Sequence, residues 1–98
     1  MPQVIYTQQS QEDIKRCHRF LFEKDSRAAI AAIKTIHHAL HILEQHPEAG
    51  RPVEGYSDEF REWIIDYGEG GYVALYQFDG SSIVILAIKH QKEIGYVL

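Results

Sequence analysis

The sequence predicts an α+β fold in which an antiparallel helical hairpin packs on a mainly antiparallel sheet. Residues 60–90 contain three runs rich in β-branched and aromatic residues, separated by glycine turns at 68–71 and 79–80, which is typical of a three-stranded meander. Residues 10–46 contain two stretches with apolar residues at helical spacing, joined by a very short connection. Neither helix can bury its apolar side alone, so both are expected to lie on the sheet of one domain spanning residues 1–98.

The β-prone run at residues 3–7 is expected to add a strand to this sheet, which would then have four strands. The first helix is expected to begin at Ser10, because Ser10 and Asp13 resemble a capping box, and to continue to about Glu23. Its inward stripe is expected to contain Ile14, Cys17, His18 and Leu21, flanked by Phe20 and Phe22.

The second helix is expected to be capped by Asp25 and Ser26 and to end near His46, because Pro47 follows. Residues 47–59 are rich in proline, glycine and acidic residues without periodicity, which predicts a loop. The inward stripe of the second helix is expected to contain Ala29, Ile30, Ile33, Ile36, Leu40 and Leu43.

The last run, residues 82–90, is apolar at nearly every position, which predicts a strand near the middle of the sheet. It ends in Lys89 and His90, which strand alternation places on opposite faces. A buried strand with a polar end is a candidate functional position.

Composition and charge exclude several classes of protein. The single cysteine, Cys17, allows no disulfide within the chain and favours a reducing cytoplasm, and no apolar run approaches the length needed to cross a membrane. The net charge is −4, and residues 41–79 hold nine acidic and two basic residues. Nucleic-acid binders usually carry an excess of lysine and arginine, so direct DNA binding is not expected.

Four segments, in this order, resemble the RelE/ParE superfamily of type II toxin–antitoxin modules, whose members are often labelled plasmid-stabilisation proteins. They are 46–52 (HPEAGRP), 60–63 (FREW), 72–78 (YVALYQF) and 85–92 (ILAIKHQK), and they are closer to the ParE branch than to the RelE branch. The resemblance implies a toxin held inactive by a cognate antitoxin in a hetero-oligomer, with no cofactor. The ParE branch implies binding and inhibition of DNA gyrase. The RelE branch implies metal-independent cleavage of messenger RNA on the ribosome, and a non-toxic orphan that binds only its antitoxin is a third alternative.

If the chain is a nuclease, Arg61, His90 and Tyr96 are the candidate catalytic residues. Attack by a 2′-hydroxyl needs a base, an acid and a cation to stabilise the phosphorane. Two of them also have a structural interpretation: Arg61 could pair with a nearby acid, and His90 could hydrogen-bond a backbone carbonyl at the sheet edge.

Candidate contacts with the target or the antitoxin are Arg51, Arg61, Trp63, Lys89, His90 and Lys92. Arg51 could instead cap the end of the second helix. We expect the C-terminal part of the antitoxin to lie in a groove between sheet and hairpin, covering the region of Arg61 and His90, because exposed strands and apolar grooves attract extended and helical segments.

Three further features have mainly structural interpretations. His37 and His41 stand four residues apart, which suits a pair of metal ligands, but a third ligand is not evident and no metal site is expected. Cys17 is expected to be a buried core residue. The helical hairpin carries five basic residues, which form either a solvated face or a surface for an acidic partner: Lys15, Arg16, Arg19, Lys24 and Arg27.

Overall fold

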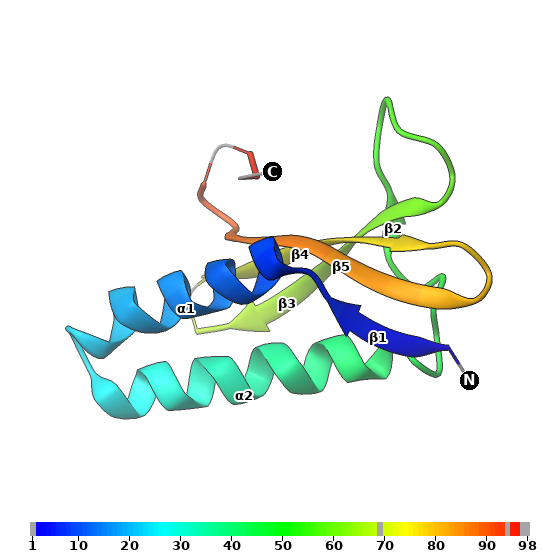
Figure 1. Ribbon diagram of the computed structural model, residues 1–98. Coiled ribbons are helices and arrows are strands. Elements are labelled where there is room, and N and C mark those ends of the chain that lie inside the picture. Colours follow the sequence, from blue (N-terminus) through cyan, green and yellow to red (C-terminus); the bar gives the residue numbers. More distant parts are fainter. Residues whose placement is uncertain (1, 69, 94, 97–98) are drawn as a thin grey trace.

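The computed structural model describes residues 2–68, 70–93 and 95–96, and it confirms the predicted α+β architecture (Figure 1). The helices of the described chain pack on one face of the sheet, and the C-terminal segment lies on the side of the sheet away from α2. The elements in chain order are β1 (Gln3–Tyr6), α1 (Gln8–Phe22), α2 (Ser26–Ile42), β2 (Arg51–Pro52), β3 (Phe60–Tyr67), β4 (Gly70–Phe78) and β5 (Ser82–His90).

Within the described residues, the strands form one five-stranded sheet in the order β1-β5-β4-β3-β2. The predicted meander is confirmed, because β3, β4 and β5 are antiparallel neighbours, and β1 adds to β5 in parallel. The sequence predicted four strands and missed one, β2. Strand β2 lies in the segment expected to be a loop, where Arg51 pairs with Glu62 and Pro52 with Arg61. Two residues show no alternation that a sequence pattern can reveal.

Strand β5 is an internal strand between β1 and β4, as its apolar sequence predicted. On the helix side Ile83, Ile85 and Ile88 are buried, and several positions on the other side are half-buried. The turn before it also follows the prediction, because Gly80 has a φ of 94° and the Asp79 carboxylate accepts hydrogen bonds from the N–H groups of Ser81 and Ser82.

Helix α1 begins earlier than expected. Thr7 is the N-cap, and its hydroxyl oxygen accepts a hydrogen bond from the N–H of Ser10 at 3.1 Å. The same hydroxyl donates to the carbonyl of Ile85 in β5 at 2.8 Å, which ties the helix start to the sheet. The capping box at Ser10 and Asp13 was therefore a wrong prediction, and both residues are instead buried against β5.

The predicted inward stripe of α1 is confirmed only in part. Ile14 and Cys17 are buried, and His18 and Leu21 are half-buried. Phe20 and Phe22 are 62% and 53% exposed. Both belong to the last turn of α1, and the tip of the hairpin extends beyond the sheet (Figure 1).

Helix α2 is capped by Asp25, as predicted, and it ends at Ile42, after which a turn leads to His46. Ile30 was wrongly placed in its inward stripe and is 51% exposed. The buried positions begin at Ala29, and a neighbouring residue lies about 100° around the helix axis, which turns Ile30 away from the sheet.

Two aromatic residues of β3 attach α2 to the sheet. The Trp63 indole N–H donates to the carbonyl of Ala39 at 2.9 Å, and the Tyr67 hydroxyl donates to the carbonyl of Ala28 at 2.9 Å. The core between helices and sheet contains mainly aliphatic side chains, among them Val4, Ile14, Ile36, Leu40, Ile65, Ile83, Ile85 and Ile88. Within the described residues, no helix combines the length and apolar character that a membrane crossing requires.

Candidate functional site

The end of β5 presents its two polar residues to opposite sides of the sheet, as predicted. His90 pairs with Tyr72 and lies on the helix side, whereas Lys89 pairs with Val73 and lies on the other side, which we call the open face. The candidate residues are therefore divided between two surfaces.

A groove of about 760 Å³ separates α1 from the end of the sheet where β3 turns into β4. This is the groove between sheet and hairpin that the sequence predicted. One wall is formed by Cys17, Phe20 and Leu21 of α1. The opposite wall contains Tyr67, Tyr72 and His90 of the sheet, and Arg16, Lys92 and Glu93 lie at its charged end. The site is thus an apolar channel with a polar end.

His90 is held in this groove by its neighbours. Its ring packs edge-on against Tyr72, with centroids 5.6 Å apart, and its Nδ1 accepts a hydrogen bond from the N–H of Lys92 at 3.1 Å. The structural interpretation of His90 therefore needs correction, because the imidazole bonds a backbone N–H and not a backbone carbonyl. With Nδ1 as acceptor, the proton of the neutral ring lies on Nε2.

The charged end of the groove is an ion pair between Arg16 and Glu93. The Arg16 guanidinium donates to both carboxylate oxygens at 2.9 Å and also contacts the carbonyl of Ile88 at 3.3 Å. Glu93 accepts a further hydrogen bond from the N–H of His90. Burial opposes ionisation of this carboxyl, but the hydrogen bonds from His90 and Arg16 outweigh it and lower the pKa of Glu93.

Sequence reasoning missed Glu93 altogether and treated Arg16 only as one charge of a basic face. The two residues stand 77 positions apart, and an ion pair across that distance leaves no local pattern. Asp13 was expected in a capping box, but its buried carboxylate instead accepts a hydrogen bond from the N–H of Ile88 at 2.9 Å.

Arg61 lies at the far end of the sheet from His90. Its Nη1 donates to the carbonyls of Glu48 at 3.1 Å and Gly50 at 2.8 Å, so within the described residues its partners are carbonyls of the loop and not the acid that the sequence suggested. Tyr76 holds the same loop, because its buried hydroxyl donates to the carbonyl of Pro47 and accepts from the N–H of Gly50. Arg61 is thus part of a clamp on the segment that follows α2.

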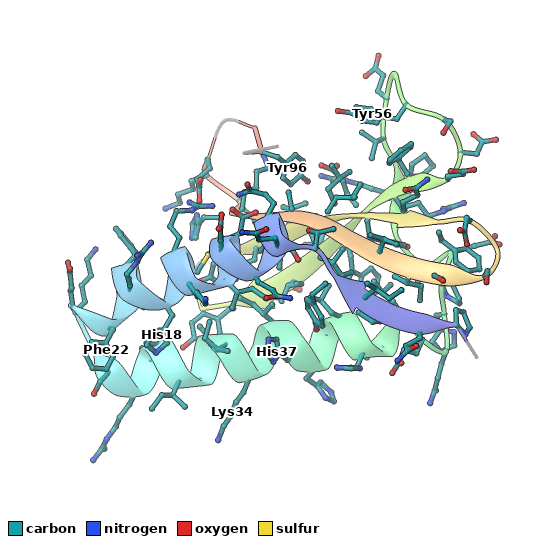
Figure 2. The ribbon with its side chains drawn as sticks, in the orientation of Figure 1. His18, Phe22, Lys34, His37, Tyr56 and Tyr96 are labelled. Atoms are coloured by element: carbon teal, nitrogen blue, oxygen red, sulfur yellow. The ribbon has the colours of Figure 1, made fainter. Side chains whose placement is uncertain are left out.

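Tyr96 lies on the open face, where Figure 2 shows it on the side of the sheet away from α2. Its hydroxyl donates to Glu62, whose other carboxylate oxygen accepts a hydrogen bond from Nε of Arg51 at 3.1 Å. Burial and the neighbouring Glu62 carboxylate raise the pKa of Tyr96. Arg51 accordingly pairs with Glu62 and does not cap the end of α2. Lys89 completes this group, with its ammonium 5.1 Å from the Tyr96 ring.

The three candidate catalytic residues do not meet. Arg61 and His90 pair with Tyr76 and Tyr72 of β4. Those two tyrosines are four residues apart along the strand, which corresponds to about 13 Å. Tyr96 lies on the opposite face. No shared position for a scissile phosphate follows from this arrangement.

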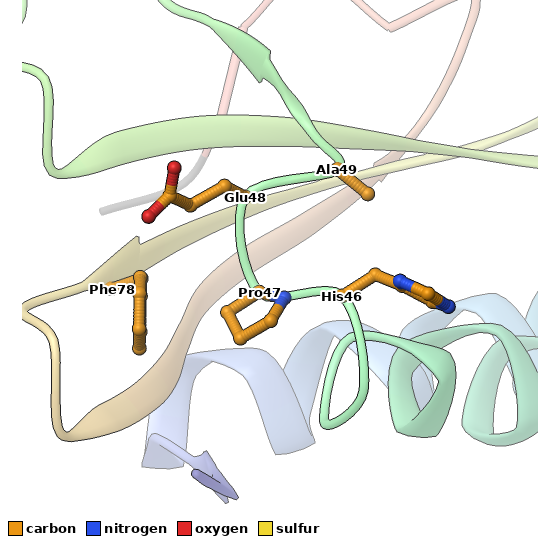
Figure 3. Close-up of a pocket in the computed structure, with 5 residues that line it drawn as sticks. All are labelled: His46, Pro47, Glu48, Ala49 and Phe78. Atoms are coloured by element: carbon orange, nitrogen blue, oxygen red, sulfur yellow. The ribbon is translucent and has the colours of Figure 1, made fainter. Parts of the chain in front are cut away.

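A second hollow, of about 470 Å³, lies beside the clamped loop (Figure 3). His46, Pro47, Glu48 and Ala49 follow one another along its loop side, and Phe78 of β4 closes it from the sheet. It is a shallow surface feature made by the rigid turn after α2.

His37 and His41 of α2 contact different neighbours. His41 Nδ1 lies 3.0 Å from a carboxylate oxygen of Glu44, and the His37 ring packs at 5.6 Å from Tyr6. In the part of the chain that the structure describes, there is no group of three or more histidine, cysteine, aspartate or glutamate residues that could hold a metal ion.

The comparisons with known proteins agree with the fold. The model of the ParE toxin of the type II toxin–antitoxin system parDE matches residues 4–95. Toxin RelE1 of Caulobacter vibrioides is 32% identical over 90 residues, which cover 92% of this chain and 94% of that protein. Toxin RelE3 of the same organism is 31% identical over 84 residues, which cover 86% of this chain and 88% of that protein.

A solved structure described as the chromosomal ParDE TA system from P. aeruginosa superposes with a TM-score of 0.77 and 22% identity, covering 92% of this chain and 96% of that one. This likeness shows the shared fold. The fold and the relatives together define a toxin of a type II toxin–antitoxin module. Within the RelE/ParE superfamily, the chain belongs to the ParE toxin family. Membership in this family supports an antitoxin as its partner.

Proposed function

We propose that this toxin acts by binding and inhibiting DNA gyrase, and that a cognate antitoxin neutralises it. The observation that carries the proposal is the separation of Arg61, His90 and Tyr96. Cleavage of RNA through the 2′-hydroxyl requires a base, an acid and a cation around one phosphate. Here Arg61 donates a hydrogen bond to the carbonyl of Gly50, and Tyr96 donates one to the carboxylate of Glu62. The two residues lie on different faces of the sheet. A toxin that acts by binding needs no such convergence.

The charge distribution supports the same proposal. Residues 41–79 hold nine acidic residues, and phosphate contacts dominate the affinity of proteins for RNA. An acidic middle of the chain is unfavourable for docking on ribosome-bound RNA. One observation favours the alternative, a ribosome-dependent endonuclease, because both curated relatives bear the name RelE.

The groove beside α1 is the position that we propose for the C-terminal part of the antitoxin. Its apolar walls would bury apolar side chains of the antitoxin, and Phe20 at its mouth is 62% exposed. Of the proposed contact residues, His90 and Lys92 line this groove, Arg61 and Trp63 are half-buried on the helix side, and Arg51 and Lys89 are on the open face. The antitoxin in this groove would therefore contact the residues on the helix side, and Arg51 and Lys89 on the open face would be left for contact with the target.

Two assays on the purified toxin separate the target hypotheses. We expect inhibition of supercoiling by purified gyrase and no cleavage of messenger RNA in a coupled translation reaction. His90→Ala tests the nuclease alternative, with His46→Ala as the matched control, because His46 is an exposed histidine outside the groove. Cleavage by the wild type that His90→Ala abolishes and His46→Ala preserves would refute the gyrase proposal.

The antitoxin proposal has its own matched pair of variants. Phe20 lines the groove, whereas Phe22 is similarly exposed at the same helix end but stacks on His18 outside the groove lining. We expect Phe20→Ser to weaken binding of the antitoxin by about tenfold or more, since burial of a phenylalanine contributes roughly 1.5–3 kcal/mol. Phe22→Ser should leave the affinity nearly unchanged. Equal effects of the two variants would remove the groove from the antitoxin interface.

A further inference from the structure

The open face of the sheet divides into a covered and an uncovered half. In the covered half, Tyr96 reaches from near Lys89 on β5 to Glu62 on β3 and therefore lies across β4. The residues of β4 beneath it, Val73 and Leu75, are 4% and 1% exposed. The C-terminal segment thus acts as the cover of this half.

The uncovered half carries a row of side chains that crosses four strands. Strand pairing aligns Ile5 of β1 with Val84 of β5, Val84 with Gln77 of β4, and Gln77 with Phe60 of β3. Beyond Phe60, Tyr56 extends the row, with ring centroids 5.5 Å apart. We call these five residues the transverse row; its strand part spans about 14 Å at the usual strand spacing.

The ends of the transverse row are open to solvent. Ile5 is 44% exposed and Tyr56 is 49% exposed, and Val84 and Phe60 between them are half-buried. Tyr56 belongs to the loop at residues 53–59, which rises from the sheet on the same side as the C-terminal segment (Figures 1 and 2). The row is apolar except at its centre, where the Gln77 amide donates a hydrogen bond to the Glu59 carboxylate at 2.6 Å. A mainly apolar strip on a solvent-facing sheet is a recognised mark of an interaction surface.

The charge at the Tyr56 end of the row has one sign. Glu54, Asp58 and Glu59 are all exposed, and residues 53–60 contain no lysine or arginine. The nearest arginine in sequence before the loop, Arg51, bonds the Glu62 carboxylate. The apolar row therefore ends in a negative rim.

We propose that the transverse row and its acidic rim form a second interaction surface, which binds a segment of the target protein that carries apolar residues flanked by lysine or arginine. Apolar contact would supply the buried area, and the negative rim would select and orient a basic segment. A nucleic acid is disfavoured because its phosphates would meet this rim. The inference rests on the proposed function in taking the occupant to be the target, since the groove assigned to the antitoxin lies on the other side of the sheet.

The chemistry of the occupant can be tested on the isotope-labelled full chain by backbone amide chemical shifts. The probe is a short synthetic peptide that alternates lysine with leucine, and the control peptide has glutamate in place of lysine. We expect the lysine peptide to shift the amides of Ile5, Phe60 and Val84 and to bind more weakly as salt is added. The glutamate peptide should not bind at the row.

The double variant Glu54→Lys, Asp58→Lys should lower the affinity for the lysine peptide by about tenfold or more, because like charges then face each other. Glu12→Lys, Glu23→Lys is the matched control, since both residues are exposed acids on or beside α1. Shifts confined to the groove, equal binding of the two peptides, or no effect of the Glu54, Asp58 reversal would overturn the proposal. Row shifts produced by a single-stranded RNA and not by the lysine peptide would do the same.

Growth arrest in cells that express the toxin without antitoxin gives a readout that does not depend on the identity of the target. We expect the Glu54, Asp58 reversal to relieve growth arrest and to leave the affinity for the antitoxin within about twofold, with gyrase supercoiling measured in parallel. If the wild type arrests growth but does not inhibit gyrase, the gyrase proposal is refuted. The proposed interaction surface is then tested by whether Glu54→Lys, Asp58→Lys relieves the arrest. Full growth arrest by the Glu54→Lys, Asp58→Lys variant would overturn the proposal that this surface binds the target. If the wild type causes no arrest in the strain used, the peptide titration decides whether the surface binds a basic segment.

Discussion

The carboxylate of Asp13 in α1 accepts a hydrogen bond from the backbone N–H of Ile88 in β5 at 2.9 Å, and this contact is buried. Strand β1 pairs with β5 only as far as Ile85. Beyond that point the edge of β5 has no neighbouring strand among the described residues, and side chains take its place. Asp13 bonds the N–H of Ile88, and Glu93 bonds the N–H of His90. These side-chain hydrogen bonds take the place of a neighbouring strand and hold the end of β5 next to α1.

Asp13→Ala should destabilise the protein by about 1–3 kcal/mol, because it leaves the buried N–H of Ile88 without an acceptor. Asp13→Asn should cost less, since its amide oxygen can still accept. Urea unfolding measures the free-energy change, and amide exchange at Ile88 reports the local effect. Glu12→Ala, at an exposed neighbouring position, is the control and should change stability by less than about 0.5 kcal/mol. An Asp13→Ala protein as stable as the wild type would contradict the role assigned to this carboxylate.

Tyr76→Phe removes only the hydroxyl that bridges the Pro47 carbonyl and the Gly50 N–H. We expect a loss of about 1–3 kcal/mol in the free energy of unfolding, because the Gly50 N–H remains buried and unpaired. The control is Tyr56→Phe, which removes the same atom from an exposed tyrosine. Thermal and urea unfolding of the two variants should differ clearly; similar stabilities would mean that the loop is held by Arg61 alone.

The lowered pKa of Glu93 predicts a loss of stability in acid. The ionised carboxylate stabilises the folded state fully above the ordinary glutamate pKa of 4.5, and this contribution is lost as the pH falls through the lower pKa of the folded protein. Glu93→Gln should therefore flatten the acid limb of the stability curve, measured by urea unfolding below pH 4.5. Glu23→Gln, at an exposed acid, should leave the limb as in the wild type. If Glu93→Gln shows the same dependence of stability on pH as the wild type, the ion pair is not a source of that dependence.

Burial raises the pKa of the Cys17 thiol to about 11, and nearby Arg16 opposes this only in part. The neutral thiol therefore stabilises the folded state fully below the ordinary value of 9, and that contribution is lost as the pH rises through about 11. We expect slow reaction with a disulfide reagent near neutral pH, although Cys17 lines the groove, because the thiolate is the reactive form. The unfolded chain is the reference and should react much faster. Equal rates in the two states would show that the thiol is neither buried nor shifted.

The elements of this fold were predictable because each is encoded locally. Runs of β-branched and aromatic residues separated by glycine turns identified β3, β4 and β5, and Asp25 correctly marked the start of α2. Its end at Ile42 lies four residues before the expected end near His46. The errors arose where a local rule competed with a contact across the chain. Ser10 satisfied a capping rule, but Thr7 bonds the carbonyl of Ile85 and therefore begins the helix.

The candidate site was less predictable than the fold. Strand alternation correctly separated Lys89 from His90, and the groove was expected between hairpin and sheet. The partners of Arg61 were not predictable, because backbone carbonyls carry no sequence signature. The same holds for β2, whose two residues pair with β3 directly after the loop that Tyr76 and Arg61 hold by hydrogen bonds to its backbone.

By itself, the sequence determined most of the secondary structure and the two-layer architecture, because periodicity and turn residues act over a few positions. The toxin family was indicated separately, by the resemblance of four short segments, and the family model confirms it. Tertiary structure alone decided which polar groups meet. Arg16 and Glu93 are 77 positions apart, and Asp13 and Ile88 are 75 apart. Such pairs form when packing of α1 on β5 brings them together, and buried polar groups must then find partners. The division of the candidate residues between a groove and an open face follows from that packing.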